Sequence, residues 1–282
     1  MENTYFLACP VCGLSLAQGE KSLSCTNGHS FDLSAKGYVN LLLSRDKHSH
    51  DPGDNKEMVA SRRRFLDKGF YLPLAAGLAK TVSEIAQAKH PNGDPCAILD
   101  AGCGEGYYTG HIHKTLSESG LSFKLSGMDI SKEAVRAAAS RYKGIFFAVA
   151  SLFKLPVMSN SLDLLINCFA PASDGEFSRV LKKDGRLICV IPGKDHLYEF
   201  KRVLYDKPAY NDEKPPELPS FALEDTIRIK DTITIADGPT LQDLLSMTPY
   251  FWRTPQEGIE KLRSVQALTS DIEFLILVYR IR

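Results

Sequence analysis

The segment CAILDAGCGEGYYTG, residues 96–110, determines how the rest of the sequence is interpreted. A short apolar run ends at Asp100, glycines follow at alternate positions (Gly102, Gly104 and Gly106), and a helical pattern begins directly after them. Glycines let the backbone turn sharply and approach a ligand where a Cβ would clash. The segment therefore predicts a strand, a ligand-binding turn and a helix, with a nucleotide-like ligand at the turn.

Details of this turn distinguish between nucleotide cofactors. A dinucleotide fingerprint has its third glycine one residue later, where this chain has Tyr107. An acid directly before the turn, here Asp100, would repel a pyrophosphate but attract the ammonium group of a methionine moiety. Asp129 ends the next apolar run, where it can accept hydrogen bonds from two ribose hydroxyls. S-adenosylmethionine fits Asp100, Gly102 and Asp129 better than NAD does.

Outward from this segment, short apolar runs alternate with helical patterns as far as the end of the chain. Such alternation is typical of a parallel, doubly wound sheet. The expected strands lie at 96–101, 124–129, 145–150, 162–167, 186–191, 231–236 and 273–281. The alternation therefore predicts an α/β, doubly wound and mostly parallel sheet. Together with a turn that fits S-adenosylmethionine, it resembles the Rossmann-like fold of class I methyltransferases.

Several helices and one irregular segment are also expected. Helical spacing of apolar residues appears at 56–70, 72–89, 131–142, 196–205 and 241–247. The segment VLKKDGRLICVIP, residues 180–192, resembles the helix, turn and strand that follow the fourth strand of class I methyltransferases. The proline-rich residues 207–220 predict an irregular loop.

A second motif lies near the N-terminus, where two residues separate Cys9 from Cys12 and three separate Cys25 from His29. Two tight turns of this kind place four ligands around a tetrahedron, as in structural zinc sites with Zn–S bonds of about 2.3 Å. Because all four positions are filled, the predicted zinc would stabilise a fold and bind no water. Gly19 interrupts the intervening segment, which favours a small β module over a DNA-reading finger. The alternative is a coincidental cluster of buried cysteines.

Composition limits the partners and the compartment. The 282 residues contain 34 basic and 34 acidic side chains, so any contact with a polyanion must come from a local patch. The N-terminal residues lack the pattern of a signal peptide, and no apolar run is long enough to cross a membrane. The other four cysteines are scattered singly, as reduced thiols are in the cytosol. We therefore expect a cytoplasmic protein.

With these motifs assembled, the chain resembles the 23S ribosomal RNA guanine-N1 methyltransferases. The matching stretches are CPVCG, GHSFDLSAKGYVNLL, DPGDNKEMVASRRRFLDKGFY, LDAGCGEGYYT, GMDISKEAV, NCFAP, PGKDHLYEFK and LLSMTPYFW. They extend over nearly the whole chain. The resemblance implies methyl transfer from S-adenosylmethionine to N1 of a guanine in a hairpin of 23S rRNA.

Site residues and oligomeric state are also implied by the resemblance. Zinc would be held by Cys9, Cys12, Cys25 and His29, and S-adenosylmethionine by Tyr71, Gly104, Glu105 and His196. A homodimer is implied as well. Two positions depart from the family pattern: Ala101 stands where a larger aliphatic residue is usual, and Phe169 replaces a tyrosine before Ala-Pro. The second departure weakens any role for a phenol at position 169 in proton transfer.

Changes in composition along the chain indicate a division into three parts. Residues 1–43 would form a zinc-binding RNA-recognition module, residues 44–95 a linker and helices, and residues 96–282 the methyltransferase domain. The linker proper would be the polar stretch 44–55. A basic run of Arg62, Arg63 and Arg64 could bind RNA, although a solvated helix face is the usual role of such a run.

The proton on guanine N1 must leave during transfer, which calls for a general base or for hydrogen bonds that favour the anion. The sequence does not single out one catalytic residue; the candidates are His196, Asp174 and Glu176, besides backbone carbonyls near Ala170 and Pro171. Two other functions stay open. One is a small-molecule methyltransferase with a structural zinc cap, and the other is a non-catalytic RNA-binding protein that retains the fold.

Overall fold

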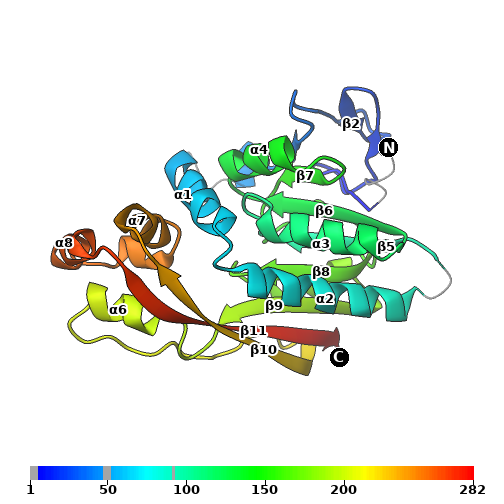
Figure 1. Cartoon of the computed structure of the whole chain (residues 1–282). Coiled ribbons are helices and arrows are strands. Elements are labelled where there is room, and N and C mark those ends of the chain that lie inside the picture. The colour runs from blue at the N-terminus through cyan, green and yellow to red at the C-terminus, as the bar shows by residue number, and fades with distance from the viewer. Residues whose placement is uncertain (1–5, 47–51, 91–92) are drawn as a thin grey trace.

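The computed structural model describes residues 6–46, 52–90 and 93–282 (Figure 1). Its strands are β1 (Ala17–Gln18), β2 (Ser22–Ser24), β3 (Ser30–Asp32), β4 (Val39–Asn40), β5 (Cys96–Ala101), β6 (Phe123–Asp129), β7 (Phe146–Val149), β8 (Leu162–Cys168), β9 (Leu181–Pro192), β10 (Phe221–Ile235) and β11 (Leu268–Ile281). Its α-helices are α1 (Lys56–Asp67), α2 (Leu72–Lys89), α3 (Tyr107–Glu118), α4 (Lys132–Arg141), α5 (Asp174–Val180), α6 (Tyr198–Leu204), α7 (Gly238–Ser246) and α8 (Gln256–Ser264). Two short 3-10 helices are η1 (Ser44–Asp46) and η2 (Pro249–Trp252).

An eight-stranded sheet, in the order β10-β11-β9-β8-β5-β6-β7-β4, forms the centre of the molecule. The strands from β9 through β8, β5, β6 and β7 to β4 are parallel, whereas β11 is antiparallel to both of its neighbours. This topology confirms the predicted α/β, doubly wound and mostly parallel sheet. No helix in the described parts of the chain is both long and apolar enough to cross a membrane.

Alternation along β5 explains why the sheet is covered on both faces. Successive side chains of a strand point to opposite faces, and every residue of β5 is buried. Ile98 belongs to an apolar cluster with residues of α2, α3 and α4, which lie on one face in Figure 1. Leu99 belongs to a second cluster that contains Phe177 of α5 and residues from the N-terminal segment.

The cysteine-rich N-terminal segment is part of this second cluster. Phe6, Leu7, Leu16 and Leu23 are fully or almost fully buried there, together with side chains from the large sheet. The small sheet β1-β2-β3 is followed by β4, which extends the large sheet by pairing in parallel with β7. The segment therefore covers one face and one edge of the large sheet, and its packing is not that of an independent appendage.

The carboxyl ends of the parallel strands are covered by a cap. Strand β11 pairs with β9 only over Phe274–Arg280, so the β10–β11 ribbon continues past the parallel strands. Helices α6 and α7 pack on this extension, α8 packs against α6 and α7, and α1 packs against α7 (Figure 1). The glycine turn directly follows β5, so it lies at the same edge of the sheet as this cap.

Most predicted elements are confirmed to within a few residues, but two differ more. Strand β10 begins ten residues before the strand expected at 231–236, because its first part is an exposed, charged stretch that pairs with β11, and α8 was not expected. The expected irregular loop contains no helix or strand between α6 and β10. Lys182 and Lys183, expected to belong to a helix and turn, lie within β9, because α5 ends at Val180. Of the expected linker 44–55, residues 47–51 lie outside the described residues. Its other end is not free: Asn55 caps α1 by accepting a hydrogen bond from the Met58 N–H at 3.0 Å.

The buried core predicts a large cost for truncating Phe147 in β7. Its ring is fully buried, so Phe147→Ala should lower the free energy of unfolding by about 3–5 kcal/mol through lost burial and a residual cavity. Phe153 is a matched control in the same region, because its ring is 63% exposed. Phe153→Ala should change stability by no more than about 0.5 kcal/mol. Urea unfolding of both variants tests the assignment, and equal losses would contradict it.

Candidate cofactor and zinc sites

The turn after β5 is held against the neighbouring strand β6. The N–H groups of Gly102 and Cys103 both donate to the carbonyl of Met128, at 2.8 and 3.0 Å. Gly102 has φ 88°, and a Cβ at this position would lie 2.5 Å from the Cβ of Ala170. Gly104 and Gly106 also have positive φ values. Only glycine meets these conditions without strain, so the sequence pattern and the observed turn agree.

Two buried carboxylates border the turn, and each has an unpaired oxygen. Asp100 Oδ2 accepts a hydrogen bond from Thr109 Oγ1 at 2.5 Å, and Glu105 Oε2 accepts one from Arg63 Nε at 3.1 Å. Asp100 Oδ1 and Glu105 Oε1 are buried without a partner among the described residues. Unpaired buried oxygens are costly, and each is available to a ligand that carries N–H or O–H groups. Burial raises the pKa of Asp100 to about 7, and Asp129 adds to this rise.

Asp129 lies at the carboxyl end of β6, directly beside the turn. Its Oδ2 accepts from the Gly104 N–H at 2.9 Å, and its Oδ1 accepts from the Ser131 N–H at 2.8 Å. Burial raises the pKa of Asp129, while these two hydrogen bonds lower it in part. Each carboxylate oxygen has a second lone pair, so the group can still accept hydrogen bonds from ribose hydroxyls. The structure thus brings Asp100, Gly102, Gly104, Glu105 and Asp129 together.

Tyr71 and His196 meet on the cap side of the same sheet edge. The Tyr71 hydroxyl lies 3.3 Å from His196 Nε2, and both rings contact the Phe274 ring, with centroids 4.9 and 4.6 Å away. The Glu273 N–H donates to His196 Nδ1 at 3.2 Å, so the proton of the neutral imidazole is assigned to Nε2. Burial, and then the charge of Lys201, lowers the pKa of His196 to about 3. The ring is therefore neutral at physiological pH.

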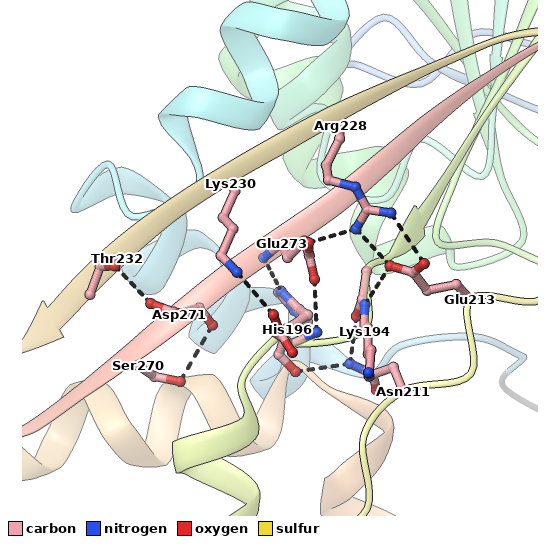
Figure 2. Close-up of polar contacts among 12 residues, drawn as sticks. Lys194, His196, Asn211, Glu213, Arg228, Lys230, Thr232, Ser270, Asp271 and Glu273 are labelled. Carbon is pink, nitrogen blue, oxygen red and sulfur yellow. Dashed lines mark hydrogen bonds and ion pairs between the residues drawn. The ribbon is translucent and has the colours of Figure 1, made fainter.

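A polar network fixes the loop that carries His196 (Figure 2). Glu273 Oε2 accepts from the Asp195 N–H at 2.8 Å, and Glu273 Oε1 accepts from Arg228 at 2.6 Å. Asn211 donates to the carbonyls of Gly193 and His196, both at 2.9 Å. Residues from the loop, the proline-rich segment and both strands of the ribbon thus hold one histidine ring in place.

The three adjacent arginines each have partners within this chain. Arg62 lies 2.5 Å from Asp54, and its guanidinium is 3.4 Å from the position of a Cβ on Gly104, so it covers part of the turn. Arg63 pairs with buried Glu105, as described above. Arg64 makes a two-oxygen contact with Asp243 of α7. The arginines connect α1 to three different neighbours, and their contact with RNA stays a prediction.

The proposed general bases are held in structural contacts. Asp174 accepts two hydrogen bonds from Ser220, at 2.9 and 2.6 Å. Glu176 accepts from the Leu155 N–H and from Arg179, and these groups lower its pKa despite partial burial. His196 uses both ring nitrogens, as described above. None of these three side chains is assigned as the base by these contacts.

The four N-terminal ligand atoms are arranged as a tetrahedral zinc site requires. All four atoms lie within 4.8 Å of one another. Cys12 Sγ is 3.7 Å from Cys25 Sγ, and His29 Nδ1 is 3.6 Å from Cys9 Sγ and 3.4 Å from Cys25 Sγ. Bonds of about 2.3 Å to sulfur in a tetrahedron separate two sulfurs by about 3.8 Å. Cys9, Cys12, Cys25 and His29 therefore fit a structural zinc ion with no open position.

Two contributors to the site were given no role in the sequence analysis, although the matching stretches LDAGCGEGYYT and NCFAP contain them. Thr109 stands in the first turn of α3, where its hydroxyl reaches Asp100. Asn167 near the end of β8 is buried and donates to the carbonyls of Ala101 and Pro171, at 3.2 and 3.3 Å. A polar residue near the end of an apolar strand was the available signal for Asn167. Thr109 had no comparable signal, because its position depends on how α3 packs.

The zinc geometry predicts that loss of one ligand releases the metal. The intact protein should contain about one zinc ion per chain, and Cys12→Ser should contain far less and unfold at a lower temperature. Metal analysis and thermal unfolding measure both effects. Cys189→Ser is the control, because this thiol lies in β9, outside every group of possible metal ligands among the described residues, and should leave the zinc content unchanged. A Cys12→Ser protein that retained a full zinc complement would refute the four-ligand assignment.

Burial of Asp100 predicts a pH-dependent stability. Its folded pKa of about 7 lies above the unfolded value of about 3.9, so its contribution is complete below pH 4 and declines as the pH rises through 7. Asp100→Asn is neutral at every pH. Between pH 5 and pH 8, the wild type should therefore lose about 2–3 kcal/mol more stability than the variant. Urea unfolding at both pH values measures the difference, and parallel losses would exclude a raised pKa.

Comparisons with known proteins find similarity over two parts of the chain and over nearly its full length. The family model described as "RlmA, N-terminal" matches residues 7–50, and the model "Methyltransferase domain" matches residues 92–238. A Bacillus subtilis protein named as a 23S rRNA (guanine-N(1)-)-methyltransferase is 32% identical over 280 residues, which cover 95% of each chain. The 23S rRNA (guanine(748)-N(1))-methyltransferase of Streptomyces fradiae is 33% identical over 281 residues, which cover 96% of each chain. The crystal structure of an S-adenosylmethionine-dependent methyltransferase from Aquifex aeolicus matches 81% of this chain and 100% of that chain, with a TM-score of 0.47 and 14% identity. The chain therefore belongs to the family of 23S rRNA (guanine-N1) methyltransferases.

Proposed function

We propose that this protein transfers the methyl group of S-adenosylmethionine to N1 of a guanine in a hairpin of 23S rRNA. One observation carries the proposal: the identity to the curated relatives extends over both the zinc segment and the methyltransferase domain. A likeness limited to the methyltransferase domain would favour the small-molecule alternative. The unpaired carboxylate oxygens at the glycine turn support cofactor binding over a purely RNA-binding role.

The proposed cofactor site lies between the sheet edge and the cap. Asp100 and Glu105 have free oxygens for donors of the ligand, Asp129 can accept from ribose hydroxyls, and the glycines allow close approach. Arg62 covers part of this turn, so its side chain would border the bound nucleoside. The proposed ligands are Tyr71, Asp100, Gly102, Gly104, Glu105, Asp129 and His196.

Bound in this site, S-adenosylmethionine would supply a methyl group on an electrophilic sulfonium carbon. The chain's own task is to hold the acceptor nitrogen in line with that carbon. His196 accepts from the Glu273 N–H at Nδ1 and has its Nε2–H directed at the Tyr71 hydroxyl, so neither ring nitrogen is free to accept the guanine proton. We leave the general base unassigned and retain the carbonyls near Ala170 and Pro171 as acceptors for the base edge.

RNA contact by Arg62, Arg63 and Arg64 is also a proposal. A guanidinium has five N–H donors, so each arginine can retain its carboxylate partner and still bind a phosphate. We further propose residues 1–43 as the RNA-recognition module, joined by residues 44–95 to the catalytic domain 96–282. A homodimer and a cytoplasmic location complete the proposal. The resemblance to the family supports the dimer, and light scattering in solution tests it.

The decisive experiment combines the purified protein with 23S rRNA and isotopically labelled S-adenosylmethionine. Nuclease digestion and mass spectrometry should find the label as N1-methylguanosine at one hairpin. Asp129→Ala should weaken cofactor binding by about tenfold or more, because charge-assisted hydrogen bonds are lost. Asp231→Asn changes an exposed carboxylate of β10 and should match the wild type. Calorimetry measures the binding.

The other two functions give different results in the same experiment. A small-molecule methyltransferase would leave 23S rRNA unlabelled and transfer the methyl group to metabolite-sized acceptors. A non-catalytic RNA-binding protein would bind the RNA without measurable affinity for S-adenosylmethionine. Either result would overturn the proposed function.

A further inference from the structure

In the loop after β8, Phe169 has a strained backbone conformation and an exposed aromatic ring. Phe169 has φ 55°, in the left-handed region that bulky residues rarely adopt, and it is 46% exposed. Of the three non-glycine residues with positive φ in the described parts of the chain, Asn160 is of a type that tolerates this region and Leu197 is fully buried. Phe169 combines backbone strain with exposure of a large apolar ring.

Several contacts hold the loop in this conformation. The Phe169 N–H donates to the carbonyl of Val190 at 3.2 Å, and Asn167 fixes both flanks of the loop through the carbonyls of Ala101 and Pro171. The next residue, Ala170, packs so closely against Gly102 that no Cβ would fit there. Strained residues that the surrounding structure holds in place are concentrated at functional sites.

The neighbours of the Phe169 ring place it at the candidate site. Its centroid lies 5.7 Å from that of Phe274, the ring between Tyr71 and His196, and 6.3 Å from that of Tyr108. Tyr108 belongs to the first turn of α3, directly after the glycine turn. Phe169 is therefore in contact with both sides of the site while much of its ring faces solvent.

We propose that Phe169 is the surface on which the target guanine stacks. The inference rests on the proposed function and names the residue that would hold the substrate base. An enzyme that acts on a base of a folded RNA must take the base out of its stack, which leaves the two flat faces of the purine without partners. Aromatic side chains commonly provide that contact in RNA recognition. A phenyl ring carries no exchangeable proton, so the role is substrate binding and not proton transfer.

Steady-state methylation of 23S rRNA by three Phe169 variants tests this assignment. Phe169→Ala should lower kcat/KM for RNA between about fivefold and about a hundredfold, the range expected for the loss of one base–aromatic stack. Phe169→Leu keeps the apolar volume but lacks a flat face, and it should lose nearly as much. Phe169→Tyr should retain activity within about threefold of the wild type, because it restores the ring. The affinity for S-adenosylmethionine should stay within about twofold in all three.

Leu223→Ala is the matched control. The Leu223 side chain is 49% exposed on β10, where the residue pairs with Tyr279 of β11. Tyr279 pairs in turn with Leu187 of β9, so Leu223 lies away from the carboxyl ends of the parallel strands. The Leu223→Ala variant should leave kcat/KM unchanged.

Two kinds of failure can be told apart. Wild-type protein that leaves 23S rRNA unmethylated would overturn the proposed function itself. With an active wild type, three results would overturn the stacking assignment alone: full activity of Phe169→Ala, full activity of Phe169→Leu, or a loss explained by weaker cofactor binding.

Discussion

The tight connection between β5 and β6 at their carboxyl ends is the constraint on which the rest of the site depends. Two N–H groups of the glycine turn share the Met128 carbonyl, and a third donates to the Asp129 carboxylate. These bonds require positive φ values that only glycine adopts freely. Because the turn is pulled onto β6, it leaves room beside Gly102 for the loop after β8, and Asp100 is buried beneath it.

Burying two carboxylates at this turn lowers the stability of the folded state. Asp100 and Glu105 are both almost completely buried, and each has an oxygen without a hydrogen bond in the described structure. In an apolar environment, such groups would be protonated or replaced unless a ligand used them. Arg63 partly compensates the charge of Glu105, whereas the Thr109 hydroxyl is the only side-chain partner of Asp100 among the described residues. A cationic ligand would favour the ionised form of Asp100. The carboxylate that lowers stability at high pH is therefore also the one that cofactor binding would use.

The N-terminal segment that carries Cys9, Cys12, Cys25 and His29, called here the zinc segment, also packs as part of the methyltransferase fold. A segment this short cannot build its own core, and the metal site fixes its turns. Its apolar side chains then cover one face of the large sheet, and β4 extends the sheet edge. Loss of the metal would therefore expose apolar surface of the large sheet. The zinc segment therefore has a structural role, because it covers the methyltransferase sheet. The contact with RNA proposed above would be a second role.

The sequence by itself determined the features that depend on local pattern: the strand and helix order, the glycine turn, the zinc ligands and Asp129 at the end of β6. Period-two and helical spacing, glycine conformation and ligand spacing are local properties, so they can be read without the fold. Tertiary structure alone decided the partners of the charged side chains. Arg62, Arg63 and Arg64 form one basic run in the chain, yet helix geometry directs them to three different carboxylates. Asp54 lies just before α1, whereas Glu105 and Asp243 are far away in sequence. The same holds for the strained Phe169 and for the protonation state of His196, because both depend on contacts between residues far apart in sequence.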